Sequence, residues 1–262
     1  MNLDLFYYIM IFIIGTVFGS FFNVVGYRVP NNMSIIYPDS HCPNCNHKLK
    51  FYELIPILSY VFLRGKCKVC KKRISIFYPF FEALTGLLFL LSYISFGLNI
   101  KFFISITFIS ILLIISISDL KYYIIPDEVL VTGFILILIE LVINCFINDI
   151  SFIKGVLVPI LNGILSFLAL YLFKLFGDFA FKKESLGGGD IKLLFIIGLV
   201  VGFDMSLVTI FLASFIALPL SVFGLIKDNN NVIPFGPYLS LSSIIILLSK
   251  LNLSMILNFF TN

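Results

Sequence analysis

The feature that most constrains this chain is a series of apolar stretches, most of which are about as long as a bilayer is thick. A helix rises about 1.5 Å per residue, so about 20 apolar residues cross the hydrocarbon core. Eight stretches reach or approach that length: Leu3–Val25, Phe80–Leu98, Phe102–Ser118, Val129–Ile147, Gly155–Phe176, Ile191–Phe203, Met205–Ile226 and Leu239–Leu257. With 60% hydrophobic and 12% charged residues, against about 25% charged in soluble domains, the chain cannot cover a water-facing surface. The sequence therefore predicts an all-α polytopic membrane protein with about eight transmembrane helices.

Two of these stretches carry further expectations. Leu3–Val25 has no basic start and no small-residue cleavage site, so we expect a retained helix and not a removable signal peptide. Ile191–Phe203 is short and abuts the next stretch, and only Asp204 marks a turn between them. No internal repeat is evident along the chain.

Lys and Arg gather on one side of the predicted helices. Nine of the 18 lie between Arg28 and Arg73, and 15 of the 18 fall in or beside the loops 28–79, 119–128, 177–190 and 227–237. Basic residues accumulate on the cytoplasmic side of a membrane. We therefore expect these four loops in the cytoplasm and both termini outside. A basic cluster can also indicate nucleic-acid binding, but beside apolar spans the topological interpretation is favoured, and we expect no nucleic-acid partner.

The first of these loops contains two C-x-x-C pairs, formed by Cys42, Cys45, Cys67 and Cys70 and separated by 21 residues. This spacing is close to that of known zinc sites. Disulfides are rare in the reducing cytoplasm, and four thiolates complete a tetrahedral zinc shell. Such a shell is closed, so we expect zinc to fold the loop and not to perform chemistry. A redox-active pair is the alternative. His41 and His47 flank the first pair, and either could replace one thiolate.

Two carboxylates stand at the predicted cytoplasmic face. Asp119 ends the third apolar stretch and Asp190 begins the sixth. Carboxylates at membrane depth are costly and usually functional. Two carboxyl groups that share one water are the catalytic groups of an aspartic protease. One acts as the base, and the other, which is protonated, polarises the substrate carbonyl. The helix dipole favours Asp190, at a helix N-terminus, as the ionised member. Gly187 and Gly189 would let a substrate strand approach, and are candidate active-site loop residues.

Structural roles are the alternative for each carboxylate. Asp119 could mark the membrane edge, and Asp190 could be an N-cap after a glycine turn. Asp127 suits the first turn of a helix, where the dipole favours an acid, and it is also a candidate for the active-site loop. Glu140 lies in the middle of a predicted span, where an interhelical hydrogen bond is expected.

Taken together, these features resemble the prepilin peptidases, the bacterial type IV leader peptidases with the Gly-x-Gly-Asp motif. The resemblance covers most of the chain and is specific because the motifs occur together in this order. The motifs are Gly19-Ser20-Phe21-Phe22-Asn23-Val24-Val25, Tyr27-Arg28-Val29-Pro30, the four cysteines, Ile55-Pro56-Ile57-Leu58-Ser59-Tyr60, Leu63-Arg64-Gly65-Lys66-Cys67, Ile74-Ser75, Tyr78-Pro79, Glu82, Asp119, Ile125-Pro126-Asp127, the glycines before Asp190, and Pro234-Phe235-Gly236-Pro237.

The resemblance implies an aspartic endopeptidase of the bacterial cytoplasmic membrane that removes the basic leader of type IV prepilins or pseudopilins after a glycine. Asp119 and Asp190 match the family's catalytic aspartates. Many members then methylate the new N-terminal residue with S-adenosylmethionine. Gly65 and Lys66 match positions that the family associates with methyl transfer, and the complete cysteine loop favours the bifunctional form. S-adenosylmethionine rests on the resemblance alone.

By role, the chain divides into a first transmembrane helix (1–27), a four-cysteine zinc domain with the methyl-transfer region (28–79) and a membrane-embedded peptidase domain (80–262). Two other functions would also suit a polytopic protein with a zinc-stabilised cytoplasmic module. One is a transporter or channel, because intramembrane carboxylates also mark ion and proton pathways. The other is a non-catalytic assembly scaffold whose zinc loop docks a partner.

Overall fold

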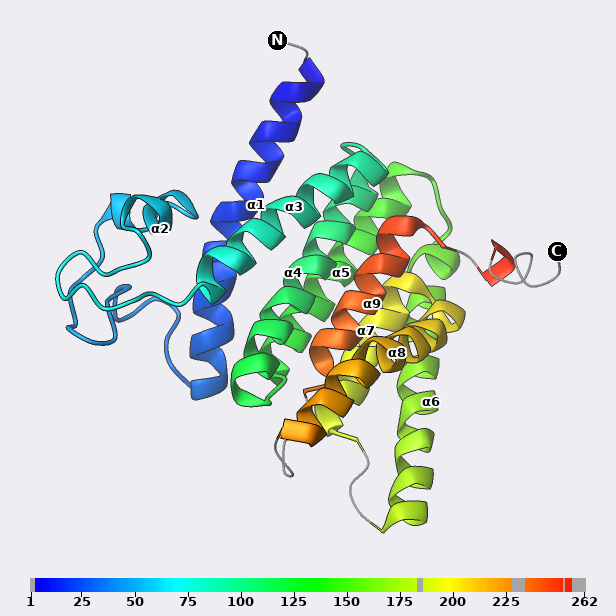
Figure 1. The fold of residues 1–262 in the computed structure, drawn as a ribbon. Coiled ribbons are helices and arrows are strands. Elements are labelled where there is room, and N and C mark those ends of the chain that lie inside the picture. Colours follow the sequence, from blue (N-terminus) through cyan, green and yellow to red (C-terminus); the bar gives the residue numbers. More distant parts are fainter. Residues whose placement is uncertain (1–2, 183–185, 228–233, 252, 256–262) are drawn as a thin grey trace. The chain divides into compact units, whose positions relative to one another are not determined.

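The chain is built almost entirely from helices. The structure is a computed structural model that describes residues 3–182, 186–227, 234–251 and 253–255. Over those residues it contains no strand (Figure 1). The elements are α1 (Leu3–Arg28), η1 (Val29–Asn31), η2 (Phe51–Glu53), α2 (Leu58–Phe62), α3 (Phe77–Phe96), α4 (Ile100–Tyr122), α5 (Asp127–Ile147), the π-helical η3 (Ile153–Leu157), α6 (Val158–Phe181), α7 (Gly188–Val201), α8 (Phe203–Lys227) and α9 (Gly236–Ser249).

Each of the eight predicted stretches overlaps one of the helices α1 and α3 to α9. Among the described residues, five helical segments are long and apolar enough to cross a membrane, namely α1, α3, α4, α5 and η3 together with α6. The helices α7 and α9 have only 14 residues each. The predicted end of the last stretch, at Leu257, lies outside the described residues. The prediction of an all-α membrane protein with a small four-cysteine module after its first helix is confirmed.

Contacts along the chain define two compact units, Met1–Leu98 and Asn99–Asn262. The division by role into 1–27, 28–79 and 80–262 concerns function and stays a prediction. In the first unit, α1 packs against α3 through small residues. A Cβ atom added to Gly15 would lie 2.7 Å from the Gly86 Cα, and one added to Gly19 would lie 2.8 Å from the Glu82 Cα. Side chains this small allow two helix backbones to approach closely, which is how helices associate where no water is present to drive them together.

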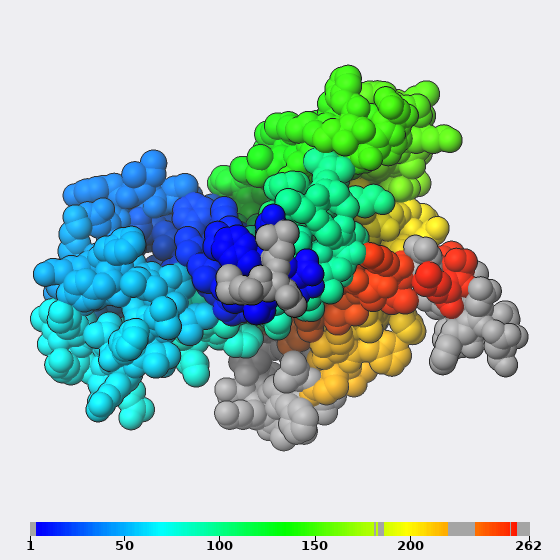
Figure 2. Space-filling view, turned by 90° about the horizontal axis from the view of Figure 1, so that it is seen from above, coloured from blue at the N-terminus to red at the C-terminus, as the bar shows by residue number. Residues whose placement is uncertain are grey.

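The segment between α1 and α3 has little regular structure. It forms a lobe beside α1 (Figure 2) and contains η1, η2 and the short helix α2. The buried Arg28 at the end of α1 donates hydrogen bonds to the backbone carbonyls of Ser34 and Pro38, at 3.0 and 2.7 Å. One guanidinium therefore supplies the donors that this irregular stretch lacks.

The second unit is a bundle in which α4 contacts α5 and α9, while α7 contacts α6 and α8. Asn99 caps α4, because its side chain accepts hydrogen bonds from the backbone of Lys101 and Phe102. The turn between α7 and α8 is made by Gly202, whose φ of +90° suits glycine. The prediction that Asp204 marks this turn is therefore wrong, because Asp204 lies in the first turn of α8.

The mid-span carboxylate behaves as expected. The Thr107 hydroxyl on α4 donates a 2.7 Å hydrogen bond to one oxygen of Glu140 on α5. This bond joins two neighbouring helices at membrane depth, so the predicted interhelical role of Glu140 is confirmed.

Candidate functional site

Asp119 lies in the last turn of α4 and is only 5% exposed. Its backbone carbonyl accepts a hydrogen bond from the N–H of Tyr123, whose left-handed conformation ends the helix. Its side-chain Oδ2 accepts a 3.0 Å hydrogen bond from the backbone N–H of Gly236, the first residue of α9. A residue 117 positions away in sequence therefore fixes the carboxylate.

Asp190 is the third residue of α7 and is 8% exposed. The N-cap of this helix is Gly187, whose backbone N–H hydrogen-bonds the Asp190 carboxylate. Asp190 is therefore not the N-cap itself. It reaches back to the N-cap backbone from the first turn, as the acidic residue of a capping box does.

The structure brings the two aspartates together. They are near enough for the charge of Asp119 to act on Asp190. Ile125, in the turn between α4 and α5, packs against Gly189, which precedes Asp190, and against Gly236, which hydrogen-bonds Asp119. A Cβ atom on Gly189 would meet the Ile125 Cδ1 at 3.2 Å, and one on Gly236 would meet the same atom at 3.4 Å. The end of α4 and the beginnings of α5, α7 and α9 therefore lie at the same end of the bundle (Figure 1), and the two aspartates are at that end.

The expected difference between the two carboxyls does not follow from their helix ends. Asp119 is at the C-terminal end of its own helix, but its oxygen is bound by the N-terminus of α9, where the dipole favours an anion. Asp190 has the same environment at the N-terminus of α7. Sequence reasoning missed Gly236 as a donor because that role depends on which helices are neighbours.

The four predicted metal ligands also come together. The Sγ atoms of Cys42, Cys45, Cys67 and Cys70 all lie within 4.8 Å of one another, and all four thiols are free of disulfides. The Sγ atoms are 3.8 Å apart for Cys42 and Cys70, and 3.9 Å apart for Cys45 and Cys67. A tetrahedron with Zn–S bonds of about 2.3 Å has S···S edges of about 3.8 Å. The donor set and its spacing therefore fit one zinc ion.

The two halves of this cluster are copies of one turn. In the first, Cys42 donates from its N–H to the His47 carbonyl and accepts from the N–H of Asn46. In the second, Cys67 makes the same two bonds with Lys72 and Lys71. The flanking bridges, His41 with Lys48 and Lys66 with Arg73, also correspond. The expectation of no internal repeat is therefore wrong for these two short turns. The two C-x-x-C pairs in the sequence could have indicated the repeat.

Backbone N–H groups in the turns favour the thiolate at two of the four cysteines, whereas at Cys45 the His47 N–H is outweighed by burial and the other thiols, which raise the pKa of that thiol to about 11. Backbone N–H groups, that of Asn44 foremost, lower the pKa of the Cys42 thiol to about 7, although burial opposes them. Backbone N–H groups of Cys70 and Val69 lower the pKa of the Cys67 thiol in the same way. Because the thiolate is the metal ligand, these donors favour the binding form.

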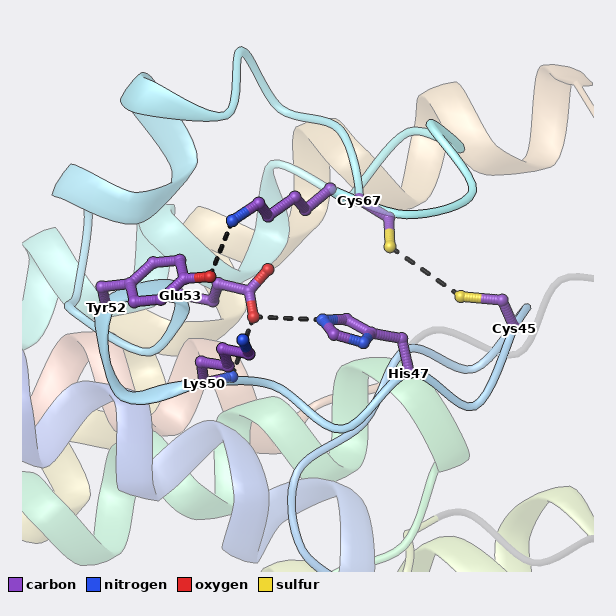
Figure 3. A network of polar contacts seen from close by, with 7 residues as sticks. Cys45, His47, Lys50, Tyr52, Glu53 and Cys67 are labelled. Atoms are coloured by element: carbon purple, nitrogen blue, oxygen red, sulfur yellow. Dashed lines mark hydrogen bonds and ion pairs between the residues drawn. The ribbon is translucent and has the colours of Figure 1, made fainter.

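A buried carboxylate supports the first turn (Figure 3). The Glu53 Oε2 accepts hydrogen bonds from the His47 ring at 3.1 Å and from the Lys50 backbone N–H at 2.8 Å. Burial of Glu53 disfavours its charge, but these donors, the Lys50 N–H first, hold the pKa of the carboxyl below its usual value. The His47 ring is hydrogen-bonded to Glu53 through Nε2, and the four Sγ atoms form a complete ligand set without it, so no replacement ligand is needed.

Two family models match this chain. The bacterial peptidase A24 N-terminal domain matches residues 13–96, and the type IV leader peptidase family matches residues 106–222. A prepilin leader peptidase/N-methyltransferase of Bacillus subtilis is 34% identical over 239 residues, which cover 90% of this chain and 92% of the relative. Proteins of the same name are 32% identical in Neisseria gonorrhoeae, over 89% of this chain and 87% of the relative, and 29% identical in Pseudomonas putida, over 88% and 86%.

The chain belongs to the type IV leader peptidase family. The resemblance read from its motifs is thereby confirmed. No solved structure matches it.

The remaining predicted site residues of this leader peptidase have distinct surroundings. Asp127 begins α5 and is exposed, and its carboxylate pairs with the Lys192 ammonium at 2.7 Å. It therefore links α5 to α7 beside the aspartates. Gly65 is buried, has a φ of +66°, and would place a Cβ atom 2.9 Å from the Tyr60 hydroxyl. Packing and backbone conformation therefore account for this glycine, whereas the adjacent Lys66 is exposed.

Proposed function

We propose that this protein is a membrane aspartic endopeptidase that removes the basic leader of a type IV prepilin or pseudopilin after a glycine, and then N-methylates the new N-terminal residue. The observation that carries the peptidase half is the pair of buried carboxyls, Asp119 and Asp190, at converging helix ends. The names of the relatives, prepilin leader peptidase/N-methyltransferase, support both halves.

Cleavage needs one ionised and one protonated carboxyl. The ionised member takes a proton from a water whose oxygen attacks the scissile carbonyl carbon, while the protonated member donates to the carbonyl oxygen. The tetrahedral intermediate then collapses, and the proton taken from water passes to the leaving amine. Asp119 and Asp190 each accept a backbone N–H, so either can be the anion, and the pair titrates as a unit.

The location of this pair suits a substrate that is itself a membrane helix. A prepilin has a basic leader on the cytoplasmic side and an apolar helix in the bilayer, so its scissile bond arrives at the membrane edge. We place Asp119 and Asp190 at the cytoplasmic edge of the inner membrane, with both termini of the chain outside. The substrate helix must unwind there, because a helical peptide bond is covered by its own hydrogen bonds.

The four-cysteine cluster is assigned a structural zinc ion held by Cys42, Cys45, Cys67 and Cys70. Four protein ligands leave no open position, so this metal folds the lobe and does not activate water. S-adenosylmethionine supplies the methyl group when it is bound. Gly65 and Lys66 are assigned to that step, Gly65 by shaping the backbone before Cys67 and Lys66 as the exposed side chain beside it.

The test is mass spectrometry of a prepilin co-expressed with the enzyme, which reports the cleavage site and any added methyl group together. Asp119→Asn and Asp190→Asn are each expected to abolish leader removal, because an amide cannot replace the ionised or the protonated carboxyl. Glu140→Gln is the matched control, since it changes a carboxyl at membrane depth outside the site. Normal cleavage by either Asn variant would refute the dyad, and cleavage without methylation would remove the second activity alone.

A further inference from the structure

Three motifs that the proposed reaction leaves without a role meet at one buried carboxylate of the first unit. Glu82, on α3, is 9% exposed, and its Oε2 accepts a 2.7 Å hydrogen bond from the backbone N–H of Ile57 in the lobe. The Ser20 side chain on α1 also lies close to this carboxylate. Asn23, one turn further along α1, donates to the Tyr78 carbonyl at the start of α3. The residues Ser20, Asn23, Ile57 and Glu82 are called the Glu82 cluster below.

The backbone that Glu82 holds is strained. Ile57 has φ of +60° and ψ of −53°, and the N–H of Leu58 bonds back to the carbonyl of Pro56. This is a γ-turn in its rare form, which is costly for any residue and more so for a β-branched one. Such a conformation persists only where the surroundings impose it. The Glu82 carboxylate is the group that binds the N–H of the strained residue itself.

The strained turn leads directly to the residues assigned to methyl transfer. Helix α2 begins at Leu58, and the carbonyl of Tyr60 within it accepts a 2.8 Å hydrogen bond from the N–H of Gly65. The Tyr60 hydroxyl also occupies the space beside Gly65. Lys66 and Cys67 follow at once, so Ile57, α2 and the second cysteine turn form one connected piece of backbone.

Glu82 therefore fixes the start of this piece to the membrane helices, while its far end is tied to the residues before α3 by the Ile74 N–H, which donates to the Gly65 carbonyl. Cysteine ligation can hold the lobe together internally, but it does not fix the lobe to α1 and α3. A carboxylate inside a helix pair at membrane depth is costly and is kept where it has a function. Of the carboxylates described in the first unit, Glu82 is the one on a long helix that bonds to the lobe.

We propose that Glu82 is a positioning residue for methyl transfer, which holds the Ile57 turn and so places Gly65 and Lys66 relative to the membrane helices. This inference rests on the proposed N-methyltransferase activity. It assigns Glu82 no part in leader cleavage, because Asp119, Asp190 and the groups that bond them all belong to the second unit.

The experiment compares leader removal with methylation in the full-length enzyme, by mass spectrometry of prepilin over a time course and over a range of S-adenosylmethionine concentrations. Glu82→Ala removes the acceptor and is expected to lower the methylation rate at least about tenfold, as misplacement near a reacting group does, with cleavage changed less than about threefold. Glu82→Gln keeps an oxygen that accepts from the Ile57 N–H, and is expected to restore most of the methylation. Zinc content is expected to stay at the wild-type value in both variants.

A second change separates positioning from chemistry. Glycine adopts a φ of +60° without strain, so Ile57→Gly in the Glu82→Ala background is expected to recover part of the methylation. Glu140→Ala is the control, since it removes a buried carboxyl from the second unit and is expected to leave the ratio of methylation to cleavage unchanged. If the Glu82→Ala protein does not accumulate, Glu82→Asp, which withdraws the carboxylate by one methylene, carries the same expectation.

Methylation by Glu82→Ala in the wild-type ratio to cleavage would overturn the inference and leave the proposed function standing. Equal losses in Glu82→Ala and Glu82→Gln, with no recovery by Ile57→Gly, would also overturn it, because the carboxylate would then act by its charge and not by holding the turn. A wild-type enzyme that cleaves but never methylates would instead refute the methyl-transfer half of the proposed function, and this inference with it.

Discussion

Gly236→Ala is expected to disable cleavage without unfolding the protein. A Cβ atom at this position would lie 2.7 Å from the Asp119 Oδ2 and 3.4 Å from the Ile125 Cδ1. The first contact is too short to keep. The atom it meets is the free end of a short side chain, so the carboxylate can turn away while the helices stay in place. The change therefore acts on the position of the carboxylate and not on the packing of α9.

The size of the effect follows from the bond that is lost. Turning the Asp119 carboxylate away breaks its 3.0 Å hydrogen bond to the Gly236 N–H. A hydrogen bond to a charged group contributes about 1.5–3 kcal/mol, and each 1.36 kcal/mol of barrier is about a tenfold change in rate. Gly236→Ala is therefore expected to lower the rate of leader removal about 10- to 150-fold, and to lower the free energy of unfolding by no more than about 1.5–3 kcal/mol, the contribution of that one bond.

The assay is single-turnover cleavage of a purified prepilin by the enzyme in detergent or nanodiscs. Gly188→Ala is the matched control: it makes the same change in the glycine run before Asp190, and a Cβ atom at Gly188 would meet nothing within 4 Å. Equal rates for Gly236→Ala and Gly188→Ala would refute the role of the Gly236 N–H. A large loss of thermal stability in Gly236→Ala would show instead that α9 was displaced.

Three further changes test other parts of the structure. Cys67→Ser removes one ligand of the four-cysteine cluster and is expected to reduce the bound zinc, measured by elemental mass spectrometry, and to open the lobe to proteases; unchanged zinc would contradict the ligand assignment. Lys192→Ala breaks a pair whose side chains are 51% and 62% exposed, so unfolding is expected to shift by less than about 1 kcal/mol, and a larger loss would show that the pair is not solvated. Thr107→Val removes the donor to Glu140 and is expected to cost about 1 kcal/mol, as membrane hydrogen bonds between helices do; unfolding in mixed micelles measures it, and no loss would mean that another donor replaces it.

The helices could be predicted from sequence because their length is set by the bilayer and not by their neighbours. The third stretch, for example, was predicted over Phe102–Ser118 and forms α4 over Ile100–Tyr122. The ends of the helix are set by its two caps, Asn99 before it and Tyr123 after it, which hydropathy does not detect. The role of Gly202 in the turn between α7 and α8 was missed for a similar reason. The sequence prediction used the charge of Asp204 nearby, whereas the backbone conformation of Gly202 makes the turn.

Local spacing also made the cysteine cluster predictable, because each pair needs only one turn to bring two thiols to one ion. The surroundings of the aspartates were not predictable in the same way. Hydropathy identifies apolar helices but does not say which of them touch, and Gly236 and Asp119 are 117 residues apart. Glu82 could be recognised in the sequence as part of a motif. Its hydrogen-bond partner could not, because the donor is the backbone N–H of Ile57 and every residue except proline has one.

The division of the chain separates the two proposed chemistries. The carboxyl pair and the N–H groups that bind it belong to the unit Asn99–Asn262, and the cysteines and the Glu82 cluster belong to Met1–Leu98. The two family models divide the chain at the same place, with residues 13–96 in one and 106–222 in the other. The connection between them contains Gly97, with φ of +70°, and Asn99, the cap of α4. In the described residues, no group that fixes the Asp119 carboxylate comes from the lobe. Loss of zinc is therefore expected to lower the rate of methyl transfer first, and to lower the rate of cleavage only if the whole protein unfolds.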